Sequence, residues 1–306
     1  MTANAQSAVL EQEAAFAAQQ ATRSLLYEVS VSPKPGLVDR FDSGAHADMD
    51  FFTYLDSSAA LTEYFRLAYL EGASSFWLAP PELFPHLRRL GVQAEQQMYA
   101  ATGGVNTHKG IIFTLGLFCG GLGWLSGRGE PADEMGLLHL CSQIVTSEFE
   151  RELKMLPRTS MRSGGERFYA ATGHSGIRGE AAAGYPSIAY CGLPALRSAL
   201  QQGYSINDAG IIALLELLCC VHDSNLFVRC GEKKQHELAQ AAREILDAEQ
   251  LDLGRVAQLN QRCVRDWASP GGCADLLAAT LFLHFYFMKP EKTERSISSE
   301  EGSLAN

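Results

Sequence analysis

Apolar residues recur along most of this chain at spacings of three and four, the pattern of helices that bury one face. Short polar segments rich in glycine and proline separate these stretches, and no stretch shows the sustained alternation of a half-exposed strand. Phe51, Phe52 and Trp267 are expected in the core. The pattern predicts an all-α protein with helices over residues 8–29, 48–71, 81–101, 107–125, 131–154, 194–202, 206–222, 234–248, 252–267 and 272–288.

The stretch 107–125 is unusual because it is apolar on nearly all sides and carries glycines at positions 110, 116, 120 and 121. A helix without a polar face belongs in a protein core. Glycine inside a helix costs roughly 1 kcal/mol relative to alanine, so several of them suggest that neighbouring backbones or a ligand approach too closely for a Cβ atom. We therefore expect one domain over residues 1–290, a multi-helix bundle around this buried helix, followed by a polar, disordered tail over 291–306.

Composition narrows the possible functions. A net charge of −10 argues against a nucleic-acid-binding surface, although a local cluster of Lys and Arg would still suffice for a nucleotide. The eight cysteines form no C-x-x-C pair and indicate reduced thiols rather than disulfides or a zinc site. The N-terminal residues lack the pattern of a signal peptide, and the longest apolar run is shorter than the roughly 20 residues that span a bilayer. We expect a cytoplasmic protein that binds no membrane.

Four polar segments interrupt the helices, at 28–50, 103–109, 162–180 and 223–225, with 271–275 as a weaker fifth. Loops gathered at one end of a bundle can build a single site. Polar loops are also simply how helices connect, so each segment alone has a structural explanation. The candidate chemistry therefore depends on whether these segments converge.

The first polar segment is stiffened by two prolines that flank Lys34, a feature that would also hold Asp39 in place. A lysine suits a phosphate and an aspartate suits Mg2+, and Glu28 at the end of the preceding helix adds a second carboxylate. The alternative is a stiff turn with a surface ion pair, which contributes little to stability.

The second polar segment leads into the glycine-rich helix and contains Asn106, Thr107, His108 and Lys109. The unpaired N–H groups and the dipole of a helix N-terminus favour an anion, so a phosphate is expected here. His108 and Lys109 are candidates for triphosphate binding or for acid–base chemistry. A histidine beside an apolar helix is also commonly a core or capping residue, and the P-loop pattern G-x-x-x-x-G-K-[ST] is absent.

The later polar segments offer a cation and several hard oxygen ligands. Arg178 and Glu180 combine a phosphate-binding fork with a carboxylate, unless they are a solvated loop pair. Asp223 and Asn225 suit Mg2+, unless they form a turn that ends a helix. Asp275 is a weak candidate, because a carboxylate near a helix start is often structural. Together the segments favour a polyphosphate-bearing substrate handled outside the usual nucleotide folds.

Motifs in these segments resemble those of the triphosphoribosyl-dephospho-CoA synthases, in the family's order and over roughly residues 20–288. The motifs are EVSVSPKPGLVDR at 28–40, GAH-x-DM at 44–49, GVNTHKG at 104–110, RGEA with GYP at 178–186, DSN at 223–225 and SPGGCADLL at 269–277. The resemblance implies a catalytic domain that converts ATP and 3′-dephospho-CoA into 2′-(5-triphosphoribosyl)-3′-dephospho-CoA and adenine. Another enzyme would then transfer this product to the acyl carrier subunit of citrate lyase or malonate decarboxylase, and residues 39–54 look more like the citrate lyase branch.

On this interpretation the 2′-hydroxyl of dephospho-CoA attacks C1′ of the ATP ribose through an oxocarbenium-like transition state, and adenine leaves. The triphosphate remains attached and serves as a handle. The implied roles are Mg2+ binding by Asp39, Asp223, Asn225 and Glu28, phosphate binding by Lys34, Arg40, Asn106, Thr107, Lys109 and Arg178, and proton transfer by Glu180 or His108.

Two other classes of function remain open from the residues alone. One is a different Mg2+-dependent all-α enzyme that acts on a nucleotide or an ADP-ribose-like substrate. The other is a non-catalytic helical partner of a lyase complex, which the concentration of charged segments disfavours. The sequence does not choose between the two proton-transfer candidates.

Overall fold

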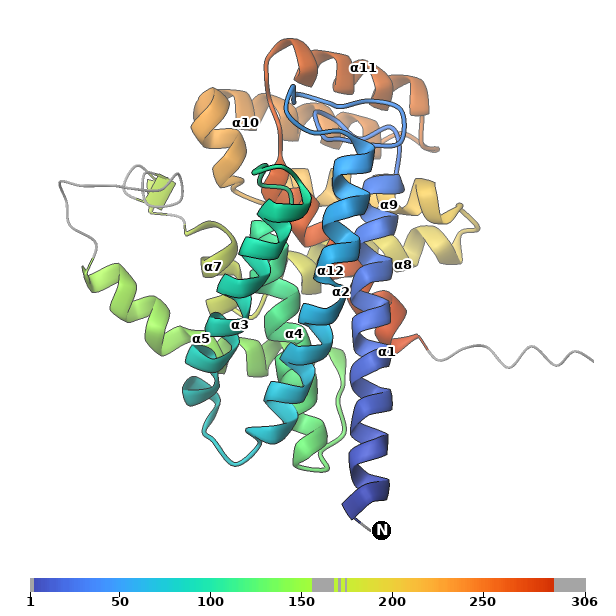
Figure 1. The fold of residues 1–306 in the computed structure, drawn as a ribbon. Coiled ribbons are helices and arrows are strands. Elements are labelled where there is room, and N and C mark those ends of the chain that lie inside the picture. The colour runs from blue at the N-terminus through green and yellow to red at the C-terminus, as the bar shows by residue number, and fades with distance from the viewer. Residues whose placement is uncertain (1–2, 156–167, 170–171, 174, 289–306) are drawn as a thin grey trace, which may run out of the picture.

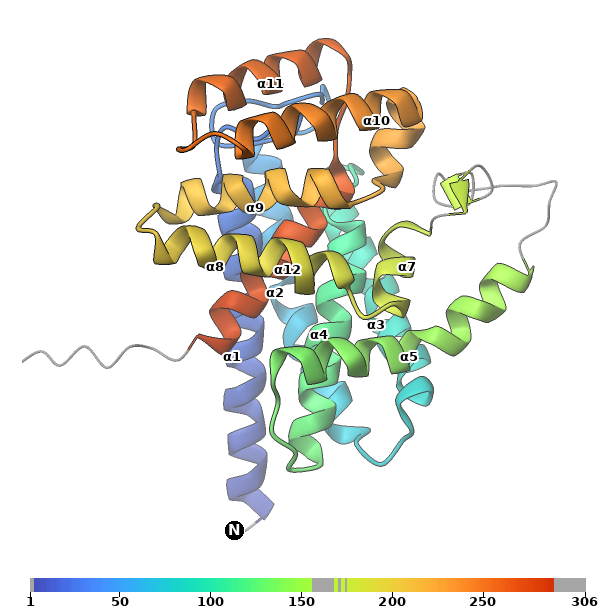
Figure 2. The same cartoon turned by 180° about the vertical axis from the view of Figure 1, so that it is seen from behind.

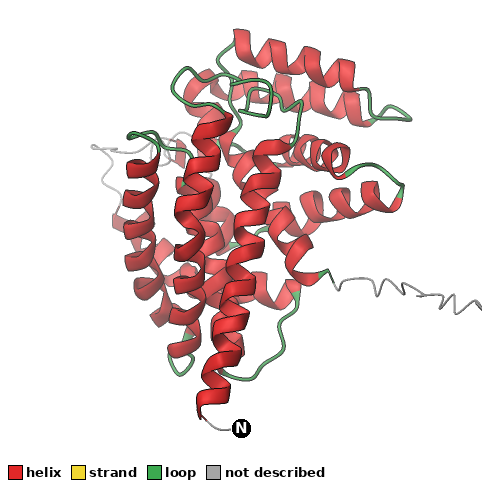
Figure 3. Cartoon of the chain, turned by 45° about the vertical axis from the view of Figure 1, so that its right-hand side comes forward, coloured by secondary structure: helices red, strands yellow, loops and turns green. Residues whose placement is uncertain are grey.

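The computed structural model describes residues 3–155, 168–169, 172–173 and 175–288, and all regular secondary structure in these ranges is helical. Figure 3 shows this directly: helices and loops make up the drawn chain. The predicted all-α class is confirmed. The glycines at 164 and 165, His174 and the tail 291–306 lie outside the described residues.

The helices fall into two sequential groups. The first group is α1 (Ala3–Ser30), α2 (Phe51–Ser74), α3 (Pro80–Ala101), α4 (Lys109–Gly127) and α5 (Glu134–Met155). The second is α7 (Gly176–Ala182), a π-helical turn (Ile188–Gly192), α8 (Leu193–Gln201), α9 (Ile206–Cys220), α10 (Ser224–Leu246), α11 (Leu253–Arg265) and α12 (Gly271–Phe287).

The two groups are oriented differently. Helices α1 to α4 run side by side along the long axis of the molecule (Figure 1). Helices α8 to α11 stack across that direction at one end, as the rear view shows most clearly (Figure 2). Helix α12 joins the groups, because it packs against α1, α4 and α9. The loop 31–50 lies at the same end as α10 and α11.

Helix α4 forms the centre of the first group, as its composition predicts. Its residues from Ile111 to Trp124 are nearly all buried, and its closest neighbour is α2. A Cβ atom on Gly72 of α2 would lie 1.9 Å from the carbonyl oxygen of Gly120, and one on Gly123 would lie 1.9 Å from that of Tyr69. The glycines therefore allow backbone-to-backbone packing between α2 and α4.

The apolar character of α4 also gives it the length and composition of a membrane span, and α9 with α10 would pass the same test as one bent span. This is weak evidence for a membrane protein, because 72% of the apolar window in α4 is buried within the helical domain. Core helices of soluble proteins have the same composition.

Two expectations from the sequence are wrong in detail. Helix α10 begins at Ser224, where Asp223 caps a helical segment that the sequence did not predict, and this segment meets the predicted helix at a kink where Gly231, with a φ of 78° and a ψ of 170°, is not helical. Phe52 and Trp267 are 69% and 60% exposed and so do not belong to the core. Phe52 is the second residue of α2 and Trp267 follows the C-cap of α11, so both lie at helix ends.

Candidate functional site

A cavity of about 810 Å³ opens where the ends of several helices meet. Its walls come from the end of α1, the first turn of α4, helix α7, the connection between α9 and α10, and the start of α12. All five polar segments singled out in the sequence contribute to this lining. The fold thus brings these segments together, although they lie far apart in the sequence.

The structure divides the predicted site residues into two sets. The residues that line the cavity are Glu28, Asn106, Thr107, His108, Lys109, Glu180, Asp223 and Asn225. The residues that do not line it are Lys34, Asp39, Arg40 and Arg178. Lys34, Asp39 and Arg40 of this second set belong to the loop 31–50, the proline-rich loop, which therefore differs from the cavity wall in its content of predicted site residues.

Asp39 organises the loop from within. One carboxylate oxygen accepts hydrogen bonds from Ser32 Oγ at 2.8 Å and from the Lys34 N–H at 3.1 Å. The other accepts from the N–H groups of Phe41 and Asp42, at 2.8 and 3.0 Å. Both oxygens of Asp39 are thus occupied within the fold, its side chain is buried, and it does not line the cavity, so its Mg2+ role stays a prediction.

The two cations of the loop are also engaged. Lys34 is buried, forms an ion pair with the Glu28 carboxylate and donates to the Glu28 carbonyl at 2.8 Å. Burial raises the pKa of Glu28, and the Lys34 charge opposes that rise. Arg40 is exposed and donates to Asn207 at 3.2 Å. Of these residues only Glu28 reaches the cavity wall.

His108 precedes α4 and is held by a hydroxyl chain. Thr107 Oγ1 donates to Ser57 Oγ at 2.7 Å, and Ser57 Oγ lies 2.6 Å from His108 Nδ1. With Thr107 donating to Ser57, a bond from the Ser57 hydroxyl to Nδ1 gives both hydroxyl protons an acceptor, and this arrangement assigns the ring proton to Nε2. Nε2 is buried and has no partner among the described residues. Burial and the Lys34 charge lower the pKa of His108 to about 3, so the ring is neutral.

Lys109 stands at the first turn of α4, on the rim of the cavity. It is 54% exposed and forms an ion pair with Glu95 of α3 at 2.9 Å. Asn106 caps the same turn, because its side-chain oxygen accepts from the Lys109 N–H at 3.2 Å. Lys109 also lines a second, smaller cavity, and Arg178 lies on the wall of that second cavity.

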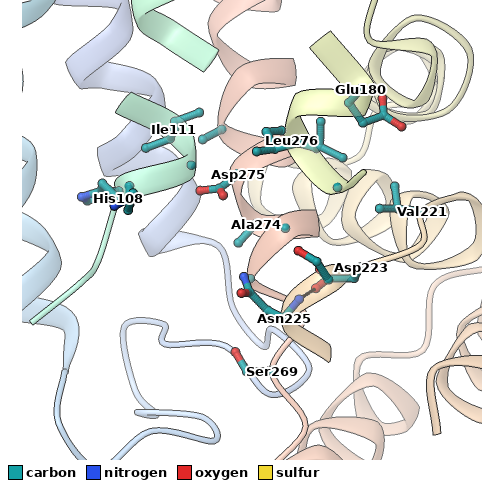
Figure 4. A pocket seen from close by; sticks show the side chains of 18 of the residues that line it. His108, Ile111, Glu180, Val221, Asp223, Asn225, Ser269, Ala274, Asp275 and Leu276 are labelled. Atoms are coloured by element: carbon teal, nitrogen blue, oxygen red, sulfur yellow. Dashed lines mark hydrogen bonds between the residues drawn. The ribbon is translucent and has the colours of Figure 1, made fainter. Parts of the chain in front are cut away.

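Asp275, in the first turns of α12, is the central carboxylate of the site. Figure 4 shows it beside the start of α4, near Ile111, with Asp223 on its other side. Its approach to α4 requires Gly110, where a Cβ atom would lie 2.0 Å from the Asp275 carboxylate. Burial raises the pKa of Asp275 well above its usual range, the charges of Asp223 and Glu28 raise it further, and only the N–H of Ile111 opposes the rise.

Asp223 connects two helices of the site. One of its oxygens accepts from the N–H groups of Asn225 and Leu226 at 2.8 and 2.9 Å, which caps α10. The other accepts from the Cys273 N–H at 2.9 Å, which fixes the start of α12. Burial raises the pKa of Asp223 despite these bonds. Asp223 therefore ties the start of α10 to the start of α12, the helix that carries Asp275.

Glu180 faces the cavity from α7. Its carboxylate accepts two hydrogen bonds from Ser187, from the hydroxyl at 2.7 Å and from the N–H at 3.2 Å. Burial raises the pKa of Glu180, and the two bonds from Ser187 oppose that rise. An oriented carboxyl group with a raised pKa is suited to proton transfer.

The donor set fits Mg2+ only if a ligand completes it. Within the described residues no three His, Cys, Asp or Glu side chains lie close enough to hold a metal ion by themselves. Asp223 and Asp275 are nevertheless buried carboxylates, and no lysine or arginine in the described part of the chain forms an ion pair with either. Mg2+ commonly binds one or two carboxylates together with substrate phosphates, and these two residues match that arrangement.

Sequence reasoning undervalued Asp275 and missed Ser57. Asp275 looked like an ordinary carboxylate near a helix start, and its one distinguishing signal was Gly110, a glycine in the first turn of a distant helix. Ser57 lies inside α2 with no motif around it, and its role depends on a contact with a residue 51 positions away.

Comparison with known proteins identifies the family of the chain. The family model for ATP:dephospho-CoA triphosphoribosyl transferase matches residues 14–294. A Streptococcus mutans protein named probable 2-(5''-triphosphoribosyl)-3'-dephosphocoenzyme-A synthase is 37% identical over 282 residues, which cover 87% of this chain and 94% of that protein. A Vibrio cholerae protein of the same name is 37% identical over 272 residues, covering 86% of each chain.

No solved structure matches the chain. The family match spans most of the helical domain, including every segment that lines the cavity. The chain belongs to the ATP:dephospho-CoA triphosphoribosyl transferase family.

Proposed function

We propose that this chain transfers the triphosphoribosyl group of ATP to the 2′-hydroxyl of 3′-dephospho-CoA in the large cavity, with release of adenine. Family membership supports the reaction. The observation that carries the choice of site is the placement of Asp275, a buried carboxylate without a cationic partner in the described residues, against the N-terminus of α4.

The start of α4 is proposed to bind the triphosphate. The helix dipole at this N-terminus and the Lys109 ammonium favour an anion there. Asp275 at the same place would repel a triphosphate unless a divalent cation lay between them. Asp275 and Asp223 would hold Mg2+, with Asn225 as a further oxygen donor. Bound Mg2+ would neutralise part of the triphosphate charge and orient it.

Glu180 is the better of the two candidates for proton transfer. His108 is a weak base because its pKa is about 3, and its Nδ1 is already engaged by Ser57. We assign to His108 a hydrogen bond from Nε2–H to the ligand, and to Glu180 the role of general base. The O2′–C1′ bond forms while the C1′–N9 bond of ATP breaks, and the hydroxyl proton passes to Glu180 and then to the departing adenine or to water.

The product would serve as the prosthetic-group precursor that another enzyme attaches to an acyl carrier subunit. The similarity findings do not separate a citrate lyase from a malonate decarboxylase pathway. The citrate lyase branch, that transfer and a cytoplasmic location therefore stay predictions from the sequence.

The direct test is to incubate the pure protein with ATP, Mg2+ and 3′-dephospho-CoA and to analyse the products by mass spectrometry. We expect one adenine per acceptor consumed and a product that retains all three phosphates. Release of phosphate or pyrophosphate without adenine would indicate a nucleotide hydrolase instead. Absence of any ATP-dependent turnover would favour a non-catalytic partner of a lyase complex.

A further inference from the structure

A second cavity of about 180 Å³ adjoins the first, between α3 and α4. Lys109, Gly110 and Ile177 line both cavities, so the two meet at the first turn of α4 and at α7. The remaining wall is mostly apolar and includes Phe84 and Phe113, whose rings pack edge to face. A ligand that extends from the first cavity into the second would pass from polar to apolar surroundings.

Two glycines make the second cavity hollow. Gly91 of α3 and Gly116 of α4 both face the hydroxyl of Tyr64, and Cβ atoms on them would lie 3.5 and 1.9 Å from that oxygen. The hydroxyl donates to the Ile112 carbonyl at 3.0 Å, so its proton is not available to a ligand. The space therefore favours a chain of methyl and methylene groups over a group that needs many hydrogen bonds.

The change from polar to apolar surroundings between the two cavities matches the order of chemical groups in 3′-dephospho-CoA. In 3′-dephospho-CoA the reacting ribose is followed by a diphosphate and then by the pantetheine arm. In the protein the large cavity is followed by Lys109 and Arg178, both on the wall of the second cavity, and then by its apolar interior.

We propose that the second cavity binds the apolar part of the pantetheine arm of 3′-dephospho-CoA, with the diphosphate beside Arg178. This inference rests on the proposed transfer reaction and adds to it the way in which the acceptor is recognised. It predicts that the arm contributes to binding, so the wild-type protein should bind 3′-dephospho-CoA about tenfold or more tightly than ADP, which lacks the arm.

The variant Gly91→Leu tests the cavity itself. The new Cβ would make ordinary contacts, at 3.5 Å from Tyr64 and 3.9 Å from Ile112, while the rest of the side chain occupies the space. We expect calorimetry to show about tenfold weaker binding of 3′-dephospho-CoA, with binding of ADP and of Mg2+·ATP unchanged. Gly91→Ala, which fills less of the cavity, should show a smaller loss. Gln93→Leu places the same side chain on an exposed position of α3 and should change nothing.

Several outcomes would overturn the inference. Equal wild-type affinities for 3′-dephospho-CoA and ADP would do so without any substitution, which matters if Gly91→Leu fails to fold. Unchanged affinity for 3′-dephospho-CoA in a folded Gly91→Leu protein would also overturn it, and so would a loss confined to Mg2+·ATP. Failure of the transfer reaction itself is separate, because it would appear as absence of adenine release from the wild-type protein.

Discussion

The proline-rich loop and the cavity at the start of α4 are both rich in buried charge, and they differ in how that charge is satisfied. In the loop, Asp39 accepts four hydrogen bonds and Lys34 is paired with Glu28. In the cavity, His108 Nε2 has no hydrogen-bond partner in the described part of the chain, and Asp275 faces two other carboxylates. Buried charge is costly unless compensated, so compensation within the fold indicates a structural role and its absence indicates a ligand.

The largest expected effect comes from Asp275→Asn. Adenine release should fall by about 1,000-fold or more, because the variant removes a cation-binding oxygen at the triphosphate. The ligand-free protein should become more stable, because the folded state binds a proton at Asp275 more tightly than the unfolded state does. In the wild type, the cost of ionising Asp275 in the folded state grows as the pH rises above 3.8, the ordinary pKa of aspartate. The variant does not have this cost, so its gain in thermal midpoint over the wild type should be larger at pH 8 than at pH 5.

The matched control is Asp56→Asn, a substitution on the exposed face of α2. It should change neither turnover nor the pH dependence of stability. If the turnover of Asp275→Asn stays within tenfold of the wild type, the functional role assigned to the cavity carboxylate, in contrast to the carboxylate of the loop, is wrong.

The next effect is that of Lys109→Ala, which should lower kcat/KM for ATP by roughly 30- to 100-fold. This is the range expected when one charge-assisted hydrogen bond to a phosphate, worth about 2–3 kcal/mol, is lost. Glu95→Gln provides the control, because it removes the ion-pair partner and leaves the Lys109 charge in place. Its steady-state rates should stay within about threefold of the wild type, and equal losses in the two variants would point to the ion pair instead.

Ser57→Ala should have a moderate effect, about tenfold on turnover, because the hydroxyl that fixes the tautomer of His108 is lost. Nitrogen NMR of histidine-labelled protein should show Nε2 protonated in the wild type and a mixture of tautomers in the variant. Ser58→Ala is the matched control, since Ser58 is equally buried in α2 but donates to the Tyr54 carbonyl. An unchanged imidazole spectrum in Ser57→Ala would refute the assigned tautomer.

The smallest effect on activity is expected in the loop. Asp39→Asn should leave turnover per folded molecule within about threefold, while urea denaturation shows a loss of about 1–3 kcal/mol in the free energy of unfolding. The reason is that an amide cannot accept at both positions that Asp39 occupies. A large loss of turnover with an unchanged free energy of unfolding would indicate that Asp39 is a ligand of Mg2+ after all.

The contrast also explains what was predictable from sequence. Helical periodicity and glycine content are local properties, so the all-α class and the buried helix α4 could be predicted from the residues alone. The polar segments were recognisable too, because their composition breaks that periodicity. Whether a charged side chain in such a segment forms an ion pair depends on residues that are distant in the sequence. Lys34 and Lys109 have the same side chain, but only the fold shows that one is buried against Glu28 and the other exposed beside Glu95.

The central claim is that Asp275 in the cavity, and not Asp39 in the loop, binds Mg2+ with the triphosphate. Calorimetric titration of ATP with and without Mg2+ into the wild type, Asp275→Asn and Asp39→Asn tests it directly. We expect Asp275→Asn to bind Mg2+·ATP at least tenfold more weakly but to bind metal-free ATP as tightly as the wild type or more tightly, because the repulsive charge is gone. Asp39→Asn should follow the wild type in both titrations. Wild-type affinity of Asp275→Asn for Mg2+·ATP, or an equal loss in Asp39→Asn, would contradict the claim.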